Sequence, residues 1–114
     1  MRQCLALDLS DDPNAIAQYE AYHLRIWPEI VEHLYTCGVV AMEIYRIGTR
    51  LTMVMETDDT VFDAVRMHAA GLADPKVREW EALMSRFQRA TPWTPVGVKW
   101  VPMKRIFDLS CQKH

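Results

Sequence analysis

Two neighbouring apolar segments, residues 39–47 and 50–57, constrain the fold of this chain most strongly. Only Gly48 and Thr49 separate them, and a glycine in the first position of a two-residue loop is typical of a type II′ β-hairpin. Strand alternation places Val40, Met42 and Ile44 on one face, and Val39, Ala41, Tyr45 and Ile47 on the other. An antiparallel sheet usually keeps one face in water, whereas both faces are largely apolar here. We therefore expect helices to cover one face and a second subunit to cover the other.

The longest helical pattern covers residues 13–36. Asp12 followed by Pro13 is a common helix start, because the aspartate can cap free N–H groups and proline fits the first turn. Pro28 lacks a backbone donor and clashes with the preceding turn, which predicts a kink just before it. Gly38 is expected to end the helix in a left-handed conformation.

Strand and helix patterns also alternate through the rest of the chain. Residues 3–9 form a strand pattern, residues 58–70 a helix capped by Asp58-Asp59-Thr60, residues 76–90 a further helix, and residues 98–109 a last strand interrupted by Pro102. The order is β-α-β-β-α-β, the ferredoxin-like arrangement, in which an antiparallel sheet carries its helices on one face. We therefore expect an α+β fold in a single domain spanning residues 1–114, since domains commonly hold about 100–150 residues.

Charge, hydropathy and cysteine content exclude several classes of function. The net charge is −2, and no basic patch is available to neutralise phosphates, so we expect no nucleic-acid partner. No apolar run approaches the roughly 20 residues of a membrane-spanning helix, and no signal peptide is evident, so we expect no membrane association. Three widely spaced cysteines indicate neither a disulfide framework nor a zinc site and favour a cytoplasmic protein.

Sequence motifs for metals and cofactors are absent. The four histidines form no i,i+4 pair on one helix, the four glycines are isolated, and no Gly-x-Ser-x-Gly segment occurs. We therefore expect neither a metal nor a cofactor.

Tyr19 and His23 form the one pair that suggests chemistry. They lie one turn apart on the apolar stripe of the first helix and therefore project into the same space between helix and sheet. Histidine exchanges protons near neutral pH, a tyrosine hydroxyl can orient a sugar hydroxyl, and aromatic rings suit the apolar faces of a pyranose. On their spacing alone, however, Tyr19 and His23 are better interpreted as simple packing residues.

The segment Tyr19-x-x-x-His23 followed by Ile26-Trp27-Pro28-Glu29 resembles the signature of the L-rhamnose mutarotase family. The likeness continues through Gly38, Ile44-Tyr45, Trp80 and Arg105-Ile106-Phe107-Asp108-Leu109. It implies a cofactor-free homodimer of ferredoxin-like subunits, of the dimeric α/β-barrel type. It also implies an isomerase, a mutarotase or aldose 1-epimerase, that interconverts the α and β anomers of a 6-deoxy-L-sugar.

The resemblance also implies roles for individual residues. His23 corresponds to the catalytic histidine, and Tyr19 and Trp80 correspond to substrate-binding residues. Met42 and Glu81 stand where the rhamnose enzymes carry a tyrosine and a second tryptophan, so L-rhamnose and L-fucose both remain candidate substrates.

The base at the anomeric hydroxyl is open among Asp8, Glu81 and a bound water. Two alternative functions share this fold class: a cofactor-independent monooxygenase and a non-catalytic dimeric domain that binds a small molecule.

Overall fold

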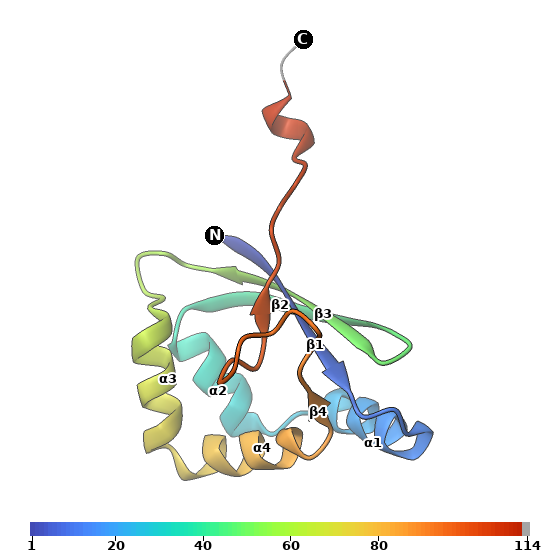
Figure 1. Cartoon of the computed structure of the whole chain (residues 1–114). Helices are drawn as coiled ribbons and strands as arrows, with labels where there is room; N and C mark the ends of the chain where they lie inside the picture. Colours follow the sequence, from blue (N-terminus) through green and yellow to red (C-terminus); the bar gives the residue numbers. More distant parts are fainter. Residues whose placement is uncertain (113–114) are drawn as a thin grey trace.

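The computed structural model describes residues 1–112 of the chain. These residues form one antiparallel sheet, and four helices lie on one side of it (Figure 1). The strands are β1 (Arg2–Leu9), β2 (Val39–Ile47), β3 (Arg50–Thr57), β4 (Gln88–Arg89) and β5 (Val101–Pro102). The helices are α1 (Pro13–Leu24), α2 (Pro28–Thr36), α3 (Ala64–Ala73) and α4 (Pro75–Ser85), and a 3₁₀ turn, η1 (Leu109–Cys111), lies near the C-terminal end.

The strand order is β2-β3-β1-β4, and β5 also pairs with β1. Every pairing is antiparallel; β4 pairs with the end of β1, and β5 pairs with its middle. This order confirms the expected ferredoxin-like arrangement with helices on one face. The sheet is open, with β2 at one edge and β4 and β5 at the other, so residues 1–112 of one chain do not close a barrel.

The hairpin between β2 and β3 is confirmed, since a two-residue loop joins the strands and Gly48 has a φ of 54°. A β-bulge near the start of β2 leaves Val40 without a partner in β3. The extra residue turns Val39 onto the helix-covered face, where it is buried, while Val40 is exposed. The expectation that Val40 shares a face with Met42 is therefore wrong, because it assumed unbroken alternation.

The helix expected over residues 13–36 is in fact two helices, α1 and α2. Trp27 precedes the second helix in an extended conformation, with φ −61° and ψ 139°. A proline disfavours the helical conformation in the residue before it, so Pro28 begins a new helix instead of kinking a continuous one. The break lies directly after the segment that carries Tyr19 and His23. Gly38 has the expected positive φ, at 96°.

The remaining helices differ from expectation at their ends. Asp58 accepts a hydrogen bond from the backbone N–H of Thr60 and forms a separate turn. As a result α3 begins only after Asp63, whose carboxylate accepts hydrogen bonds from two backbone N–H groups. Asp74 ends α3 and caps α4, and α4 stops at Ser85 instead of residue 90. The chain then enters β4, a short strand within the stretch that was expected to be helical.

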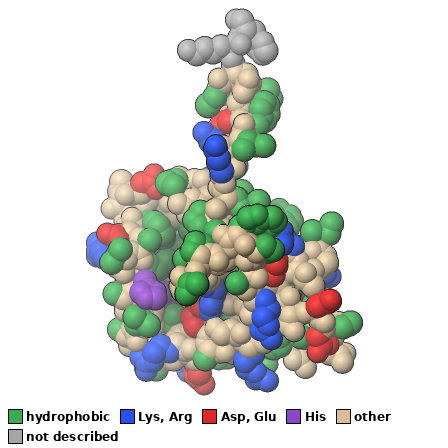
Figure 2. Space-filling model, in the orientation of Figure 1, with side chains coloured by type: hydrophobic (Ala, Val, Ile, Leu, Met, Phe, Trp, Pro, Cys, Tyr) green, Lys and Arg blue, Asp and Glu red, His purple; other side chains and the backbone are tan. Residues whose placement is uncertain are grey.

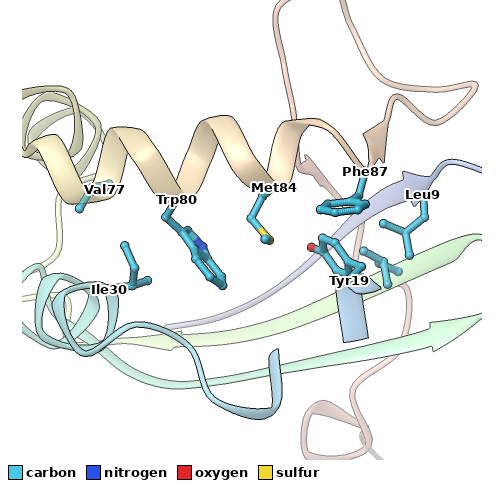
Figure 3. Close-up of a cluster of buried hydrophobic side chains, with 8 residues drawn as sticks. Leu9, Tyr19, Ile30, Val77, Trp80, Met84 and Phe87 are labelled. Carbon is cyan, nitrogen blue, oxygen red and sulfur yellow. The ribbon is translucent and has the colours of Figure 1, made fainter. Parts of the chain in front are cut away.

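A hydrophobic core fills the space between the helices and the sheet (Figure 3). Trp80 and Met84 project from α4 toward α1 and α2. The buried cluster consists of Leu9, Tyr19, Ile30, Leu51, Val77, Trp80, Met84 and Phe87. Burial of one large apolar side chain contributes roughly 1.5–3 kcal/mol, so this cluster holds α1 and α4 firmly against the sheet.

The C-terminal segment leaves the body of the protein after β5. Most of the strand expected over residues 98–109 is absent, because pairing with β1 is limited to Val101 and Pro102 and one hydrogen bond from the Met103 N–H to the Cys4 carbonyl. Residues 103–112, here named the C-terminal arm, extend away from the helices (Figure 1). Large apolar side chains along the arm are exposed, as Figure 2 shows; they are Met103, Ile106, Phe107 and Leu109.

Candidate active site

A cavity of about 290 Å³ lies between the helices and the sheet. Tyr19 and His23 of α1 and Trp80 of α4 all line it, so the structure brings together the three site residues named from the sequence. Met42 of β2 and Glu81 of α4 also line this cavity. These two positions, at which the resemblance predicts a departure from the rhamnose enzymes, therefore line the same cavity as the expected site residues.

His23 lies one turn after Tyr19 on α1, and their rings are in contact, with centroids 4.4 Å apart. Nδ1 of His23 lies 2.7 Å from the backbone carbonyl oxygen of Tyr19. A carbonyl oxygen can only accept, so Nδ1 carries a proton and donates it. In the part of the chain that the structure describes, the His23 ring makes this one hydrogen bond, and Nε2 takes no part in it. The ring is thus held in place through one nitrogen, while the other is left to exchange a proton with a ligand.

Trp80 provides an aromatic wall beside the histidine. Its ring lies 5.7 Å from the His23 ring and 5.2 Å from the Trp27 ring, centroid to centroid, and both contacts are edge-to-face. Trp27 lies at the break between α1 and α2, so the break turns a residue that was expected within a helix into a packing partner of α4. Aromatic side chains packed in this way offer an apolar surface to a sugar ring.

The Tyr19 hydroxyl is buried and accepts a hydrogen bond from Nε2 of Gln88, 3.1 Å away. Burial raises the pKa of the Tyr19 phenol above its usual value; the hydrogen bond from Gln88 lowers it, and the negative charge of Glu81 raises it further. The net shift is upward, so Tyr19 keeps its proton at neutral pH and can act as a hydrogen-bond donor.

Glu81 is the carboxylate at the mouth of the cavity. It is more than half exposed, and its Oε2 accepts a hydrogen bond from Nζ of Lys99 at 3.1 Å. Lys99 also donates to the Ser85 hydroxyl, 2.8 Å away. The carboxylate is therefore held near the cavity by a lysine while it remains open to solvent.

Asp8 lies on the opposite face of the sheet from the cavity. Its carboxylate accepts two hydrogen bonds from the Arg50 guanidinium, at 2.6 and 3.2 Å, and the Trp93 ring lies 5.2 Å from that guanidinium. The sheet thus separates Asp8 from the cavity. Of the two carboxylates considered as the base, Glu81 alone lines the cavity that His23 lines.

Gln88 and Trp100 also line the cavity, and sequence reasoning had assigned neither to the site. Gln88 was expected to lie in the last turns of a helix, whereas it belongs to the two-residue strand β4. So short a strand has no periodicity, and we know of no pattern that would have identified it. Trp100 lies just before β5.

His23 also lies at the junction with a second groove of about 380 Å³ between α2 and the edge strand β2. The groove and the cavity share His23, Ile26, Leu34, Met42 and Ile44. The groove is therefore continuous with the cavity at His23.

Within residues 1–112, no group of three or more His, Cys, Asp or Glu side chains is arranged to hold a metal ion. His114, the fourth histidine of the sequence, lies outside the described residues. In the same part of the chain, no helix combines the length and the hydropathy that crossing a membrane requires.

Comparisons with known proteins by sequence and by structure agree on one family. The sequence model of the L-rhamnose mutarotase family matches residues 2–109. An L-fucose mutarotase of Xanthomonas campestris pv. campestris is 44% identical over 96% of this chain and 88% of the relative. An L-rhamnose mutarotase of Jannaschia sp. is 30% identical over 74% of this chain and 86% of the relative.

The crystal structure of an L-rhamnose mutarotase from Formosa agariphila has the same fold. Its TM-score is 0.68 over 96% of this chain and 98% of that one, at 19% sequence identity. The family match extends over nearly the whole chain, from the first strand to the C-terminal arm. The chain therefore belongs to the L-rhamnose mutarotase family and is a sugar isomerase of the mutarotase type.

Proposed function

We propose that this protein interconverts the α and β anomers of a 6-deoxy-L-hexopyranose and that L-fucose is its preferred substrate. The observation that carries the proposal is the single cavity in which a proton-exchanging histidine, a protonated tyrosine and a tryptophan wall meet. The relative named an L-fucose mutarotase is 44% identical to this chain, and the one named an L-rhamnose mutarotase is 30% identical, which supports the choice of sugar. Met42 and Glu81, which depart from the rhamnose enzymes, line the same cavity.

Mutarotation requires two proton transfers on opposite sides of the anomeric carbon. A base removes the proton of the anomeric hydroxyl, an acid protonates the ring oxygen, and the bond between C1 and the ring oxygen breaks. The open-chain aldehyde rotates about its C1–C2 bond, and the ring closes on the other face as both protons return. General acid–base catalysis typically accelerates such steps by about 10²–10⁴-fold, which suits a reaction that already proceeds in water.

His23 is the acid at the ring oxygen in this proposal. The Tyr19 carbonyl accepts the Nδ1 proton, so Nε2 is the ring nitrogen that can donate a proton to the sugar. On ring closure the neutral Nε2 takes the same proton back. Tyr19 orients the substrate through its hydroxyl, and Trp80 packs against the apolar part of the sugar near the C6 methyl group.

Glu81 is our choice for the base at the anomeric hydroxyl. It lines the cavity together with His23, whereas Asp8 lies across the sheet in a bidentate pair with Arg50. Lys99 keeps the Glu81 side chain at the cavity mouth. A water molecule between Glu81 and the anomeric hydroxyl would serve the same proton transfer.

We also propose a homodimer in which the uncovered sheet face and the C-terminal arm contact a second copy of the chain. The face opposite the helices exposes Tyr45 and Ile47, and Ile47 is 81% exposed. The arm exposes Ile106 to 89%. Exposed apolar surface of this kind is typical of subunit interfaces.

The cytoplasm is the proposed location, because Cys4, Cys37 and Cys111 are all free and two of them are exposed.

Exchange NMR of the purified protein tests the proposed reaction. We expect the exchange rate between α and β anomers to rise with protein concentration for L-fucose, and to rise less for L-rhamnose. D-Glucose, a hexose of the opposite series that carries a hydroxyl on C6, is the control sugar. A larger effect with L-rhamnose would overturn the choice of sugar. Binding without acceleration would indicate a ligand-binding domain, and oxygen uptake with a phenol would indicate a monooxygenase.

A further inference from the structure

Gln88 lines the cavity and carries an unused hydrogen-bond acceptor. Its Nε2 donates to the Tyr19 hydroxyl oxygen, 3.1 Å away. Its other amide atom, Oε1, is buried and accepts no hydrogen bond from any residue in the described part of the chain. Native proteins rarely leave a buried carbonyl oxygen unpaired, because the group has lost its hydrogen bonds to water without replacement. The acceptor is therefore best explained by a ligand that supplies the missing donor.

The same contact determines what the Tyr19 hydroxyl can do. An amide nitrogen has only protons to give, so the phenol oxygen accepts from Gln88 and its own proton points elsewhere. Among the described residues, no group accepts that proton. Since the upward shift of the Tyr19 pKa keeps the phenol protonated, the wall offers one free donor and one free acceptor side by side.

A pyranose is well matched to such a pair. Each hydroxyl of the sugar can donate one hydrogen bond and accept others, and neighbouring ring hydroxyls are close enough to contact two adjacent protein groups. A hydroxyl oxygen can accept from Tyr19 while the same or the next hydroxyl donates to Oε1 of Gln88.

We propose that Gln88 is a substrate-binding residue whose Oε1 accepts a hydrogen bond from a ring hydroxyl of the sugar, while its Nε2 directs the Tyr19 proton toward that sugar. This inference rests on the proposed function, because the sugar is the ligand. Gln88 is well suited to the role, since β4 pairs with the end of β1 and the preceding Phe87 is buried in the core. Its amide therefore belongs to the rigid part of the fold.

Two substitutions test the inference. Gln88→Leu removes both the donor and the acceptor at similar size, and we expect KM for L-fucose to rise about five- to tenfold with a smaller change in kcat. Binding of 1,5-anhydro-L-fucitol, which lacks the anomeric hydroxyl and cannot react, should weaken by the same factor in titration calorimetry. Because the two residues act on the same sugar hydroxyls, the effects of Gln88→Leu and Tyr19→Phe should be less than additive.

Gln88→Glu separates binding from packing. While the introduced carboxyl is protonated it can replace the amide, but once ionised it accepts the Tyr19 proton that the sugar needs. KM should therefore rise with pH more steeply in this variant than in wild type, an added pH dependence that a purely structural role would not produce. If Gln88→Leu does not fold, as judged by circular dichroism, this second variant carries the test alone.

Gln18→Leu is the matched control, because Gln18 is an exposed glutamine next to Tyr19 on α1. It should leave KM and anhydrofucitol binding unchanged. A folded Gln88→Leu protein with wild-type KM and wild-type anhydrofucitol affinity would overturn the inference and leave the proposed function intact. If wild-type protein neither exchanged nor bound either sugar, the proposed function would fail and this inference with it.

Discussion

The two faces of the sheet carry side chains of similar hydropathy, and they differ in what covers them. On the helix-covered face, Leu51 and Met55 of β3 are buried beneath α1, α2 and α4. On the opposite face, Tyr45 and Ile47 of β2 are exposed, and the loop after β4 covers only the region around Asp8, where Trp93 packs on the guanidinium of Arg50. Strand hydropathy therefore does not locate the site. The site forms where helices place polar groups over an apolar floor.

The largest expected effect concerns the helix-covered face. His23→Ala should reduce the anomer-exchange rate by about 10²–10⁴-fold, because it removes the proposed acid, while circular dichroism stays unchanged. His68→Ala on α3, where the side chain is exposed, is the matched control. Full activity in a folded His23→Ala protein would mean that another group is the acid.

Core truncation on the same face should cost stability. Met84→Ala should lower the free energy of unfolding by about 2–5 kcal/mol, since the side chain is nearly fully buried against α1 and the sheet. The measurement is denaturant unfolding, with Leu72→Ala at an exposed α3 position as the control. Equal effects at the two positions would contradict the packing described above.

Glu81→Gln tests the proposed base at the cavity mouth. The exchange rate should fall about 10²-fold, at the lower end of general-base contributions, because an amide cannot accept the anomeric proton. Lys99→Met tests whether the position of the Glu81 carboxylate matters. It removes the lysine partner but keeps the carboxylate, so we expect a smaller loss of the exchange rate. Wild-type activity of the Glu81→Gln variant would leave water as the base.

Ile47→Asp tests the opposite face. A carboxylate in the proposed subunit interface should shift the equilibrium from dimer toward monomer in sedimentation velocity. We expect the dimer dissociation constant of the variant to rise at least tenfold, because the buried charge lacks a partner. Val65→Asp, at an exposed position of α3, is the control. A stable wild-type monomer, or a dimer that Ile47→Asp does not affect, would mean that this face is not the interface.

The smallest expected effect is that of Asp8→Asn. The pair with Arg50 is partly exposed, so we expect its loss to change the free energy of unfolding only slightly. Anomer exchange should be unchanged, because Asp8 lies across the sheet from the cavity. A tenfold loss of rate would restore Asp8 as a candidate base.

Local rules predicted much of the fold. The Gly48 turn, the Asp12-Pro13 helix start and the β-α-β-β-α-β order all depend on neighbouring residues and were confirmed. The errors arose where alternatives compete. Pro28 could kink a helix or divide it, and alternation through Val40 could be continuous or bulged, and in each case packing against distant residues decides.

The candidate site divides in the same way. The i,i+4 spacing placed Tyr19 and His23 together, and the resemblance to the family added Trp80. Neither could identify Gln88, because a strand of two residues exists only through its pairing with β1. By sequence alone, Asp8 and Glu81 were equally good candidates for the base. The fold distinguishes them, because the sheet separates Asp8 from the cavity that Glu81 lines.

By itself the sequence determined the order of the elements, the hairpin, the pairing of Tyr19 with His23 and the family to which the chain belongs, since these follow from short-range spacing and local residue identity. Only the tertiary structure decided which face of the sheet encloses a cavity, that Gln88 contacts Tyr19 across 69 residues of chain, and that Glu81 lines the cavity while Asp8 does not. The physical reason is that contacts between distant residues form only when the core closes, and the same closure leaves the Oε1 of Gln88 without a partner.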